Sequence, residues 1–267
     1  PLSGKATEFD LPGGVIMDGD LKSIRPFQSF KDQLFRDAVT EDVTHAYYKG
    51  QGGVHPWQGE TIPDFTEWKH EAPAPDKYTW VKGPRFEGKP AQVGPLSQVL
   101  VGIATGHELT MKWVNAAAGM VSAVNKDVKV TPAALHSTLG RIAARAIRAG
   151  MLCDLAEKHW GLLANNILSG DTTIYNAPDF PADEIVGVGM HEAPRGTLSH
   201  WVRVKGGKIT NYQAVVPTTW NASPRDDKGV SGPYEACLID NPVADPERPL
   251  EVLRTVHSFD PCMACAC

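Results

Sequence analysis

The sequence lacks any uninterrupted apolar run of the ~18 residues that a membrane-spanning helix requires, which argues against a direct membrane span. It also lacks an excess of positive charge, because 26 Lys and Arg stand against 31 Asp and Glu, for a formal net charge of −5. A nucleic-acid partner therefore has no electrostatic support. The first residues, Pro1 to Lys5, contain neither an initiator Met nor the apolar stretch of a signal peptide. We expect a processed or partial chain.

Cysteine is scarce, and its distribution is uneven. The chain has five cysteines, an odd number that is not spread as a disulfide framework would be. Cys153 and Cys237 are isolated, and we expect both to be buried thiols. The other three, Cys262, Cys265 and Cys267, lie in the last six residues. Any chemistry that depends on sulfur is therefore expected at the end of the chain.

Cys262 and Cys265 form a C-x-x-C pair. This spacing lets one turn of backbone direct two sulfurs at a single soft metal ion. By itself it is equally typical of half a structural zinc site, a redox dithiol or a disulfide. Pro261 fixes its own φ and restricts Asp260, so the backbone entering the turn is stiff.

Hydrophobic residues make up 42% and charged residues 21% of the chain, as in an ordinary globular protein. Apolar residues recur at helical spacing over 95–124 and 131–167, which predicts two long antiparallel helices. We expect Thr131 to cap the second helix. Gly102 and Gly106 would permit either a close helix contact or a break in the first.

The rest of the chain predicts short elements and long irregular segments. Two short helices are expected over 30–39 and 40–49, and the Pro- and Gly-rich stretch 51–89 precludes any long regular element. A small antiparallel sheet is expected from three β-prone segments, 184–189, 201–205 and 208–216. The predicted fold is α+β, mainly α, with residues 1–267 forming a single domain.

Several polar and aromatic residues admit a purely structural interpretation. Arg141, Arg145 and Arg148 recur at spacings of four and three, which favours a solvated basic face; contact with carboxylates of a partner is the alternative. His55 is expected to be a satisfied structural histidine. The tryptophans of the irregular stretch would anchor it by burial; they are Trp57, Trp68 and Trp80.

Several blocks of sequence, in a fixed order, resemble one known family. Residues 254–265, RTVHSFDPCMAC, resemble the carboxy-terminal signature of the large subunit of nickel-iron hydrogenases. EAPRGTLSH at 192–200 and VVPTTWN at 215–221 match two further motifs of that family. Shorter matches are HPW at 55–57, KGPRF at 82–86, PYE at 233–235 and VADP at 243–246. Together the blocks cover most of the chain from about Gly52 onward.

The resemblance implies a nickel-iron centre whose iron carries carbon monoxide and two cyanides. By position in the motif, Cys262 is a terminal nickel ligand and Cys265 bridges nickel and iron. The resemblance also makes Cys262 the first base when H2 is cleaved heterolytically, because a metal-bound thiolate stays deprotonated yet can take a proton.

The same resemblance assigns the cofactor pocket. Arg195 is expected to donate to one cyanide and Thr218 to the other, since strong acceptors in an apolar pocket need donors. Asp260 is expected to pair with Arg195, whose buried charge would otherwise be uncompensated. Pro194, Val216 and Pro217 are expected to form the apolar wall. Arg195 as an ordinary ion pair and Thr218 as a strand hydroxyl are the structural alternatives.

The sequence departs from the family pattern in two places. It has no amino-terminal C-x-x-C pair, so it looks like the carboxy-terminal half of the subunit; either another chain supplies the amino-terminal half, or the sequence is a fragment. The family's terminal His is also missing, because the chain stops at Cys267. In the family this His helps to bind a separate magnesium or iron ion, together with a backbone carbonyl that maps to Ala214. We expect Cys267 to act as a small apolar residue.

The function that this resemblance implies is the reversible cleavage of H2 to protons and electrons, the activity of an oxidoreductase. Electrons would pass to an iron-sulfur small subunit in a heterodimer, with a periplasmic or membrane-associated location through that partner. The alternatives are a non-catalytic structural subunit like that of respiratory complex I, and a zinc-stapled binding module. A disulfide between Cys262 and Cys265, or an Arg195 far away on the exterior, would count against the hydrogenase interpretation.

Overall fold

The computed structural model describes residues 8–29, 32–65, 76–127, 130–175 and 177–267. The first third of the described chain forms short elements that wrap the rest. In order they are β1 (Gly14–Ile16), a 3-10 turn η2 (Leu21–Ser23), β2 (Ile24–Pro26), α1 (Gln33–Arg36), β3 (Val39–Asp42), β4 (Tyr48–Lys49), β5 (Ile62–Pro63) and β6 (Gly83–Phe86). They pair antiparallel as β1–β2, β3–β6 and β4–β5.

The two short helices expected over 30–49 are largely absent. Only α1 is helical, with the side chain of Asp32 accepting from the amide of Leu34 at its start. Residues 39–42 form strand β3 because their alternating burial pairs them with β6, a tertiary contact that local spacing cannot reveal. The irregular character predicted for 51–89 is confirmed over its described part; Trp68 lies outside the described residues.

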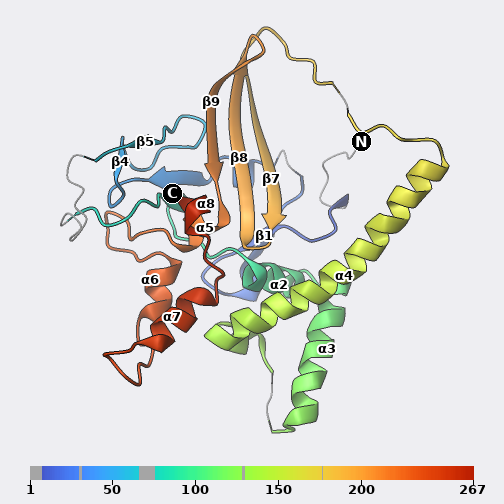
Figure 1. Ribbon diagram of the computed structural model, residues 1–267, viewed down its shortest axis with the longest axis vertical. Coiled ribbons are helices and arrows are strands. Elements are labelled where there is room, and N and C mark those ends of the chain that lie inside the picture. The colour runs from blue at the N-terminus through green and yellow to red at the C-terminus, as the bar shows by residue number, and fades with distance from the viewer. Residues whose placement is uncertain (1–7, 30–31, 66–75, 128–129, 176) are drawn as a thin grey trace.

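Three helices make the helical half of the fold. They are α2 (Pro95–Ala104), α3 (Glu108–Val124) and α4 (Thr138–Leu168), with a 3-10 turn η3 (Pro132–Leu135) before α4. Of the two outcomes left open for Gly102 and Gly106, a break occurs at Gly106, which has φ +66° between α2 and α3. In Figure 1, α4 crosses both of the other helices, so the packing involves three helices and not two long antiparallel ones.

The N-terminus of the longest helix differs from the prediction. Thr131 caps the short 3-10 turn, whereas Ser137 caps α4 by accepting a hydrogen bond from the amide of Gly140 at 3.0 Å. At Gly150 an added Cβ would lie 2.4 Å from the ring of Trp113. A glycine there allows α3 to approach α4 closely.

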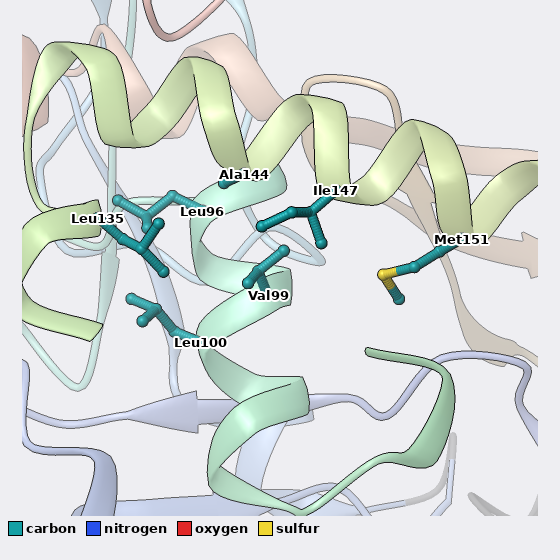
Figure 2. Packing of buried hydrophobic residues seen from close by; sticks show 7 residues of the cluster. All are labelled: Leu96, Val99, Leu100, Leu135, Ala144, Ile147 and Met151. Atoms are coloured by element: carbon teal, nitrogen blue, oxygen red, sulfur yellow. The ribbon is translucent and has the colours of Figure 1, made fainter. Parts of the chain in front are cut away.

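The helices meet in one apolar core. Figure 2 shows Leu96, Val99 and Leu100 of α2 between Leu135 and the α4 side chains Ala144, Ile147 and Met151. Burial of this stripe, and not local propensity, stabilises the helices.

A three-stranded antiparallel sheet stands beside the helices (Figure 1). Its strands are β7 (Ile185–Ala193), β8 (Gly196–Lys205) and β9 (Lys208–Val215), in the order β7–β8–β9. This confirms the predicted sheet and its Gly206-Gly207 turn, where both glycines have positive φ as a tight hairpin requires. A second core lies on this sheet, around the fully buried Trp201.

Four short helices complete the fold and deliver the end of the chain. They are α5 (Pro217–Asn221), α6 (Pro233–Leu238), α7 (Leu250–His257) and α8 (Met263–Ala266). In Figure 1, α8 lies beside α5, near the end of β9. The predicted α+β class, with long helices, a small antiparallel sheet and irregular segments, is confirmed. Over the described residues, no helix combines the length and apolarity needed to cross a bilayer.

Candidate metal centre

The cysteine-bearing tail follows a sharp reversal of the backbone. After α7 ends, Asp260 adopts φ +59°, a left-handed conformation that is uncommon outside glycine but tolerated by Asp. Pro261 follows, and Cys262 caps the single turn of α8. The amide of Cys265 donates to the carbonyl of Cys262 at 3.1 Å, so the two cysteines occupy one turn as their spacing predicts.

The two sulfurs of this turn are bonded to each other. Cys262 and Cys265 form a disulfide, with Cα atoms 5.4 Å apart. A disulfide was one of the alternatives for this spacing, and it was named above as counting against the interpretation drawn from the resemblance. The one-turn spacing suits an S–S bond as well as a metal, because Cα separations of roughly 4.4–6.8 Å are usual for such a bond. Metal ligation by Cys262 and Cys265 stays a prediction. Metal binding by this pair requires its reduction.

Arg195 reaches the tail from the hairpin turn between β7 and β8. The turn consists of Pro194 and Arg195, because Ala193 and Gly196 are the last paired residues of the two strands. Nε of Arg195 donates to the carbonyl oxygen of Asp260 at 3.0 Å, and its guanidinium lies 3.3 Å from the Asp260 carboxylate. The predicted pairing is confirmed, but both side chains are close to 40% exposed, so the expected burial of Arg195 is not observed.

The hairpin turn is fixed by close backbone packing. Gly196 has φ +133°, and an added Cβ would lie 2.6 Å from Val93 and 2.7 Å from the amide of Gly94. Gly94 in turn has φ +125° and approaches the carbonyl of Arg195. The loop that begins α2 therefore supports the turn that carries Arg195, and neither glycine can be replaced without strain.

Thr218 contacts the tail from the first turn of α5. It is only 2% exposed, and its hydroxyl oxygen accepts a hydrogen bond from the amide of Cys262 at 3.2 Å. Because a hydroxyl both donates and accepts, this contact leaves its hydrogen available for another acceptor. Pro217 is buried beside it and Val216 is half-buried, so the neighbourhood is apolar as expected, although Thr218 lies on a helix and not on a strand.

An open cavity of about 380 Å³ lies beside the cysteine turn. Ala214, Val216, Cys265 and Cys267 all border it. Cys267 is an exposed free thiol, not a packed apolar residue, and partial burial raises its pKa above the ordinary value. Ala214 therefore lies near the carboxy-terminal residues, and ion binding by its backbone carbonyl stays a prediction.

A buried polar group on the cavity wall was not anticipated. Nζ of Lys82 lies 3.5 Å from the carboxylate of Glu41 and 3.3 Å from the side-chain oxygen of Gln213. Burial raises the pKa of Glu41, and Lys82 opposes that rise. The KGPRF block was the one signal for Lys82, whereas Glu41 gave none, because its segment was interpreted as helical. Charge this close to the cysteine turn makes the cavity polar on one side.

The remaining predicted residues have structural roles or unexpected positions. His55 bonds the carbonyl of Arg36 through Nε2 at 2.6 Å and packs on Trp57 and Trp201, which confirms a structural histidine. Cys153 is exposed on α4, so its predicted burial is wrong, and Cys237 is half-buried. Helical spacing alone could not predict the exposure of Cys153, because it does not show which faces of α4 other elements cover.

The donor set fits half of a thiolate metal site. Within the described ranges no cluster of three or more His, Cys, Asp or Glu side chains gathers at one point. The chain therefore offers two soft sulfurs, once reduced, with a free hydroxyl hydrogen and a guanidinium beside them. A centre that needs four thiolates requires further ligands from outside these residues.

Comparison with known proteins identifies consistent relatives. A model of the nickel-dependent hydrogenase family matches residues 2–267. The hydrogenase-2 large chain of Escherichia coli K12 is 45% identical over 267 residues, covering 100% of this chain and 46% of that protein. The quinone-reactive Ni/Fe-hydrogenase large chain of Wolinella succinogenes is 39% identical, covering 97% and 45%.

Solved structures agree with these matches. The Ni-Fe-Se hydrogenase of D. vulgaris Hildenborough in its reduced state has a TM-score of 0.75 at 28% identity, covering 100% of this chain and 50% of that one. The chain spans about half the length of the curated relatives it matches.

Proposed function

The chain belongs to the nickel-dependent hydrogenase family, and we propose on that premise that it is the carboxy-terminal portion of a catalytic large subunit. That subunit interconverts H2 with protons and electrons. Residues 1–267 form one domain of it. The observation that carries the proposal is the convergence of separate segments on the cysteine tail. Arg195 from the β7–β8 turn contacts Asp260, and Thr218 from α5 contacts Cys262.

The reduced cysteine pair holds the metals. When bound, a nickel-iron centre with carbon monoxide and two cyanides on iron supplies the site at which H2 is split heterolytically. A dithiol reductant supplies the two electrons and two protons that convert the S–S bond to two thiols and itself becomes a disulfide; the resulting thiolates are soft ligands suited to nickel. Cys262 would hold nickel, and Cys265 would hold the centre beside it. Sγ of Cys262 also takes up the proton as the general base.

The surrounding residues bind and orient the centre. Thr218 has a free hydroxyl hydrogen because its oxygen already accepts from the amide of Cys262, so it can donate to one cyanide. Arg195 uses Nε for the carbonyl of Asp260 and keeps further N–H groups for the other cyanide. The carboxylate of Asp260 balances the charge of Arg195. Pro194, Val216 and Pro217 exclude water from the iron side.

The other ligands and the electron path belong to partners. The amino-terminal half of a large subunit, with its own C-x-x-C pair, supplies the missing thiolates, and an iron-sulfur small subunit accepts the electrons. A separate magnesium or iron ion beside the backbone carbonyl of Ala214 is part of the proposal, in the cavity that this residue borders. The quinone-reactive name of one relative supports membrane association through a partner, and a periplasmic location is a further part of the proposal.

The test is metal analysis with infrared spectroscopy of the reduced chain, produced together with the amino-terminal half and the small subunit. We expect nickel, iron in excess of nickel because the small subunit carries iron-sulfur clusters, and vibrational bands of metal-bound carbon monoxide and cyanide. Cys262→Ser should lose nickel, whereas the matched control Cys153→Ser, which alters an exposed thiol on α4, should retain it. Zinc alone would indicate the zinc-stapled module, and a metal-free wild type would indicate the non-catalytic subunit.

A further inference from the structure

Three arginines share one face of the long helix α4. Arg141, Arg145 and Arg148 are spaced by four and three residues, so their side chains project from the same side. The expectation of a solvated face is wrong. Arg148 is 4% exposed, and the Nε atoms of all three are buried with no hydrogen-bond partner among the described residues. Burial lowers the pKa of Arg141 and of Arg148. Desolvating these cations is costly, so their remaining contacts must offset that cost.

Arg148 binds the backbone that leads into the hairpin turn. Its Nη2 donates to the carbonyl of Glu192 at 3.0 Å, and its Nη1 donates to the carbonyls of Ala193 at 2.8 Å and Pro194 at 3.3 Å. The next residue is Arg195. The Glu192 carboxylate, 3.8 Å away, is within ion-pair distance but outside hydrogen-bond distance, so main-chain oxygens accept the hydrogen bonds of this guanidinium.

The other two arginines bind the segment that leads into the cysteine tail. Nη2 of Arg145 donates to the carbonyl of Ser258 at 3.0 Å. The guanidinium of Arg141 lies 4.0 Å from the ring centroid of Phe259, a cation–π distance. Phe259 packs in turn on Tyr234, with ring centroids 4.9 Å apart. Asp260 follows directly.

We propose that Arg141, Arg145 and Arg148 form a clamp that sets the position of Arg195 relative to Asp260 and Cys262. The three are positioning residues that act through the backbone. They span about 10 Å along a rigid helix, which fixes the distance between the two segments they hold. The effect on the metal centre rests on the proposed function; the clamp itself does not.

The direct contact between the two segments is too weak to do this alone. The Arg195–Asp260 ion pair is close to 40% exposed on each side, and solvent screens such a pair. The hydrogen bonds of the clamp are part-buried, and they go to main-chain carbonyls. Lysine cannot replace Arg148, because one ammonium cannot span three carbonyls as a planar guanidinium does, and at Arg145 it lacks the fixed planar geometry that directs Nη2 at the Ser258 carbonyl.

The first test is amide hydrogen exchange on the metal-free full chain, comparing Arg148→Lys and Arg145→Lys with the wild type. Arg254→Lys, at an exposed arginine on α7, is the matched control. We expect exchange over 193–197 to quicken about tenfold in Arg148→Lys, and over 258–262 by a similar factor in Arg145→Lys, since each loses a charge-assisted bond. The control should match the wild type.

The signature of a clamp is communication between the two segments. Arg148→Lys should also quicken exchange over 258–262, because a displaced Arg195 releases the Asp260 carbonyl. If Arg148→Lys leaves 258–262 unchanged, Arg148 merely supports its own hairpin and the clamp is rejected. If Arg148→Lys fails to fold, Arg145→Lys decides by the same criterion at 193–197, since it removes a single hydrogen bond.

The second test uses the assembled complex. Arg148→Lys should shift or broaden the carbon monoxide and cyanide infrared bands and lower kcat for H2, with KM unchanged. Bands identical to those of the wild type would refute a positioning role at the centre, even if exchange changes. A wild type with no nickel-iron centre would refute the proposed function, and the exchange result would still decide the clamp.

Discussion

Replacing Glu192 with glutamine should change the pH dependence of stability by a predictable amount. Burial raises the pKa of Glu192 from 4.5 to about 7, against the lowering effects of Arg148 and of the hydrogen bond from Thr197. In the unfolded chain the carboxyl titrates near its ordinary value. Between these two pH values the unfolded state releases its proton while the folded state retains it, so the folded state loses stability as pH rises.

The magnitude follows from that difference in pKa. A shift of this size corresponds to roughly 3 kcal/mol above pH 7. The side chain keeps 26% of its surface exposed, so solvent screening favours the lower part of a range of about 1–3 kcal/mol. Glutamine has nearly the same shape as the protonated acid and cannot ionise. The stability of Glu192→Gln relative to the wild type should therefore rise by this amount from pH 4 to pH 8.

The assay is urea unfolding of both proteins at several pH values, followed by tryptophan fluorescence at fixed salt. The control is Glu184→Gln, because a hydrogen bond from Arg203 lowers the pKa of Glu184. That carboxylate contributes stability above its unfolded pKa and loses it as pH falls, so its variant should show a trend of the opposite sign. A difference between wild type and Glu192→Gln that stays constant with pH would refute the burial argument.

Two further predictions concern the supports of the site. Thr218→Val should destabilise the chain by about 1–2 kcal/mol in urea unfolding, because the buried amide of Cys262 loses its acceptor, whereas Thr218→Ser should stay within a fraction of that; equal effects of the two would refute the hydroxyl's role. Gly196→Ala should lower the free energy of unfolding by more than about 2 kcal/mol, since it adds a steric clash to an unfavourable φ. Gly207→Ala should lower it by about 1 kcal/mol, because Gly207 has a positive φ but nothing lies within 4 Å of its added Cβ. Thermal unfolding of both alanine variants measures the difference, and equal losses would contradict the proposed clash.

Elements with a local cause were predictable. Three β-prone segments indicated the three-stranded sheet, and two consecutive glycines indicated its tight turn. Gly102 and Gly106 indicated either a close contact or a break; the structure has the break at Gly106 and the close contact at Gly102, where an added Cβ would lie 2.3 Å from Thr110. These outcomes depend on the backbone preferences of a few neighbouring residues.

Elements with a distant cause were not predictable. Residues 39–42 became a strand because β6 pairs with them, although their own spacing suggested a helix. The arginine row on α4 was mistaken for a solvated face, because helical spacing cannot show what packs on that face from residues 192–194 and 258–259. The buried Glu41–Lys82 pair escaped notice for the same reason, as its members are 41 residues apart.

The sequence alone determined which chemical groups the site contains. They are two sulfurs one turn apart, a proline that stiffens the backbone before them, and an arginine and a threonine that the family motifs predict to lie beside them. Such features are written in adjacent residues, whose backbone geometry admits few alternatives. Only the tertiary structure decided that Arg195 and Thr218 meet the tail, that α4 holds both segments by their carbonyls, and that the sulfurs bond to each other. Those contacts join residues mostly far apart in the chain, and burial, which gives them their strength, is a property of the packed molecule.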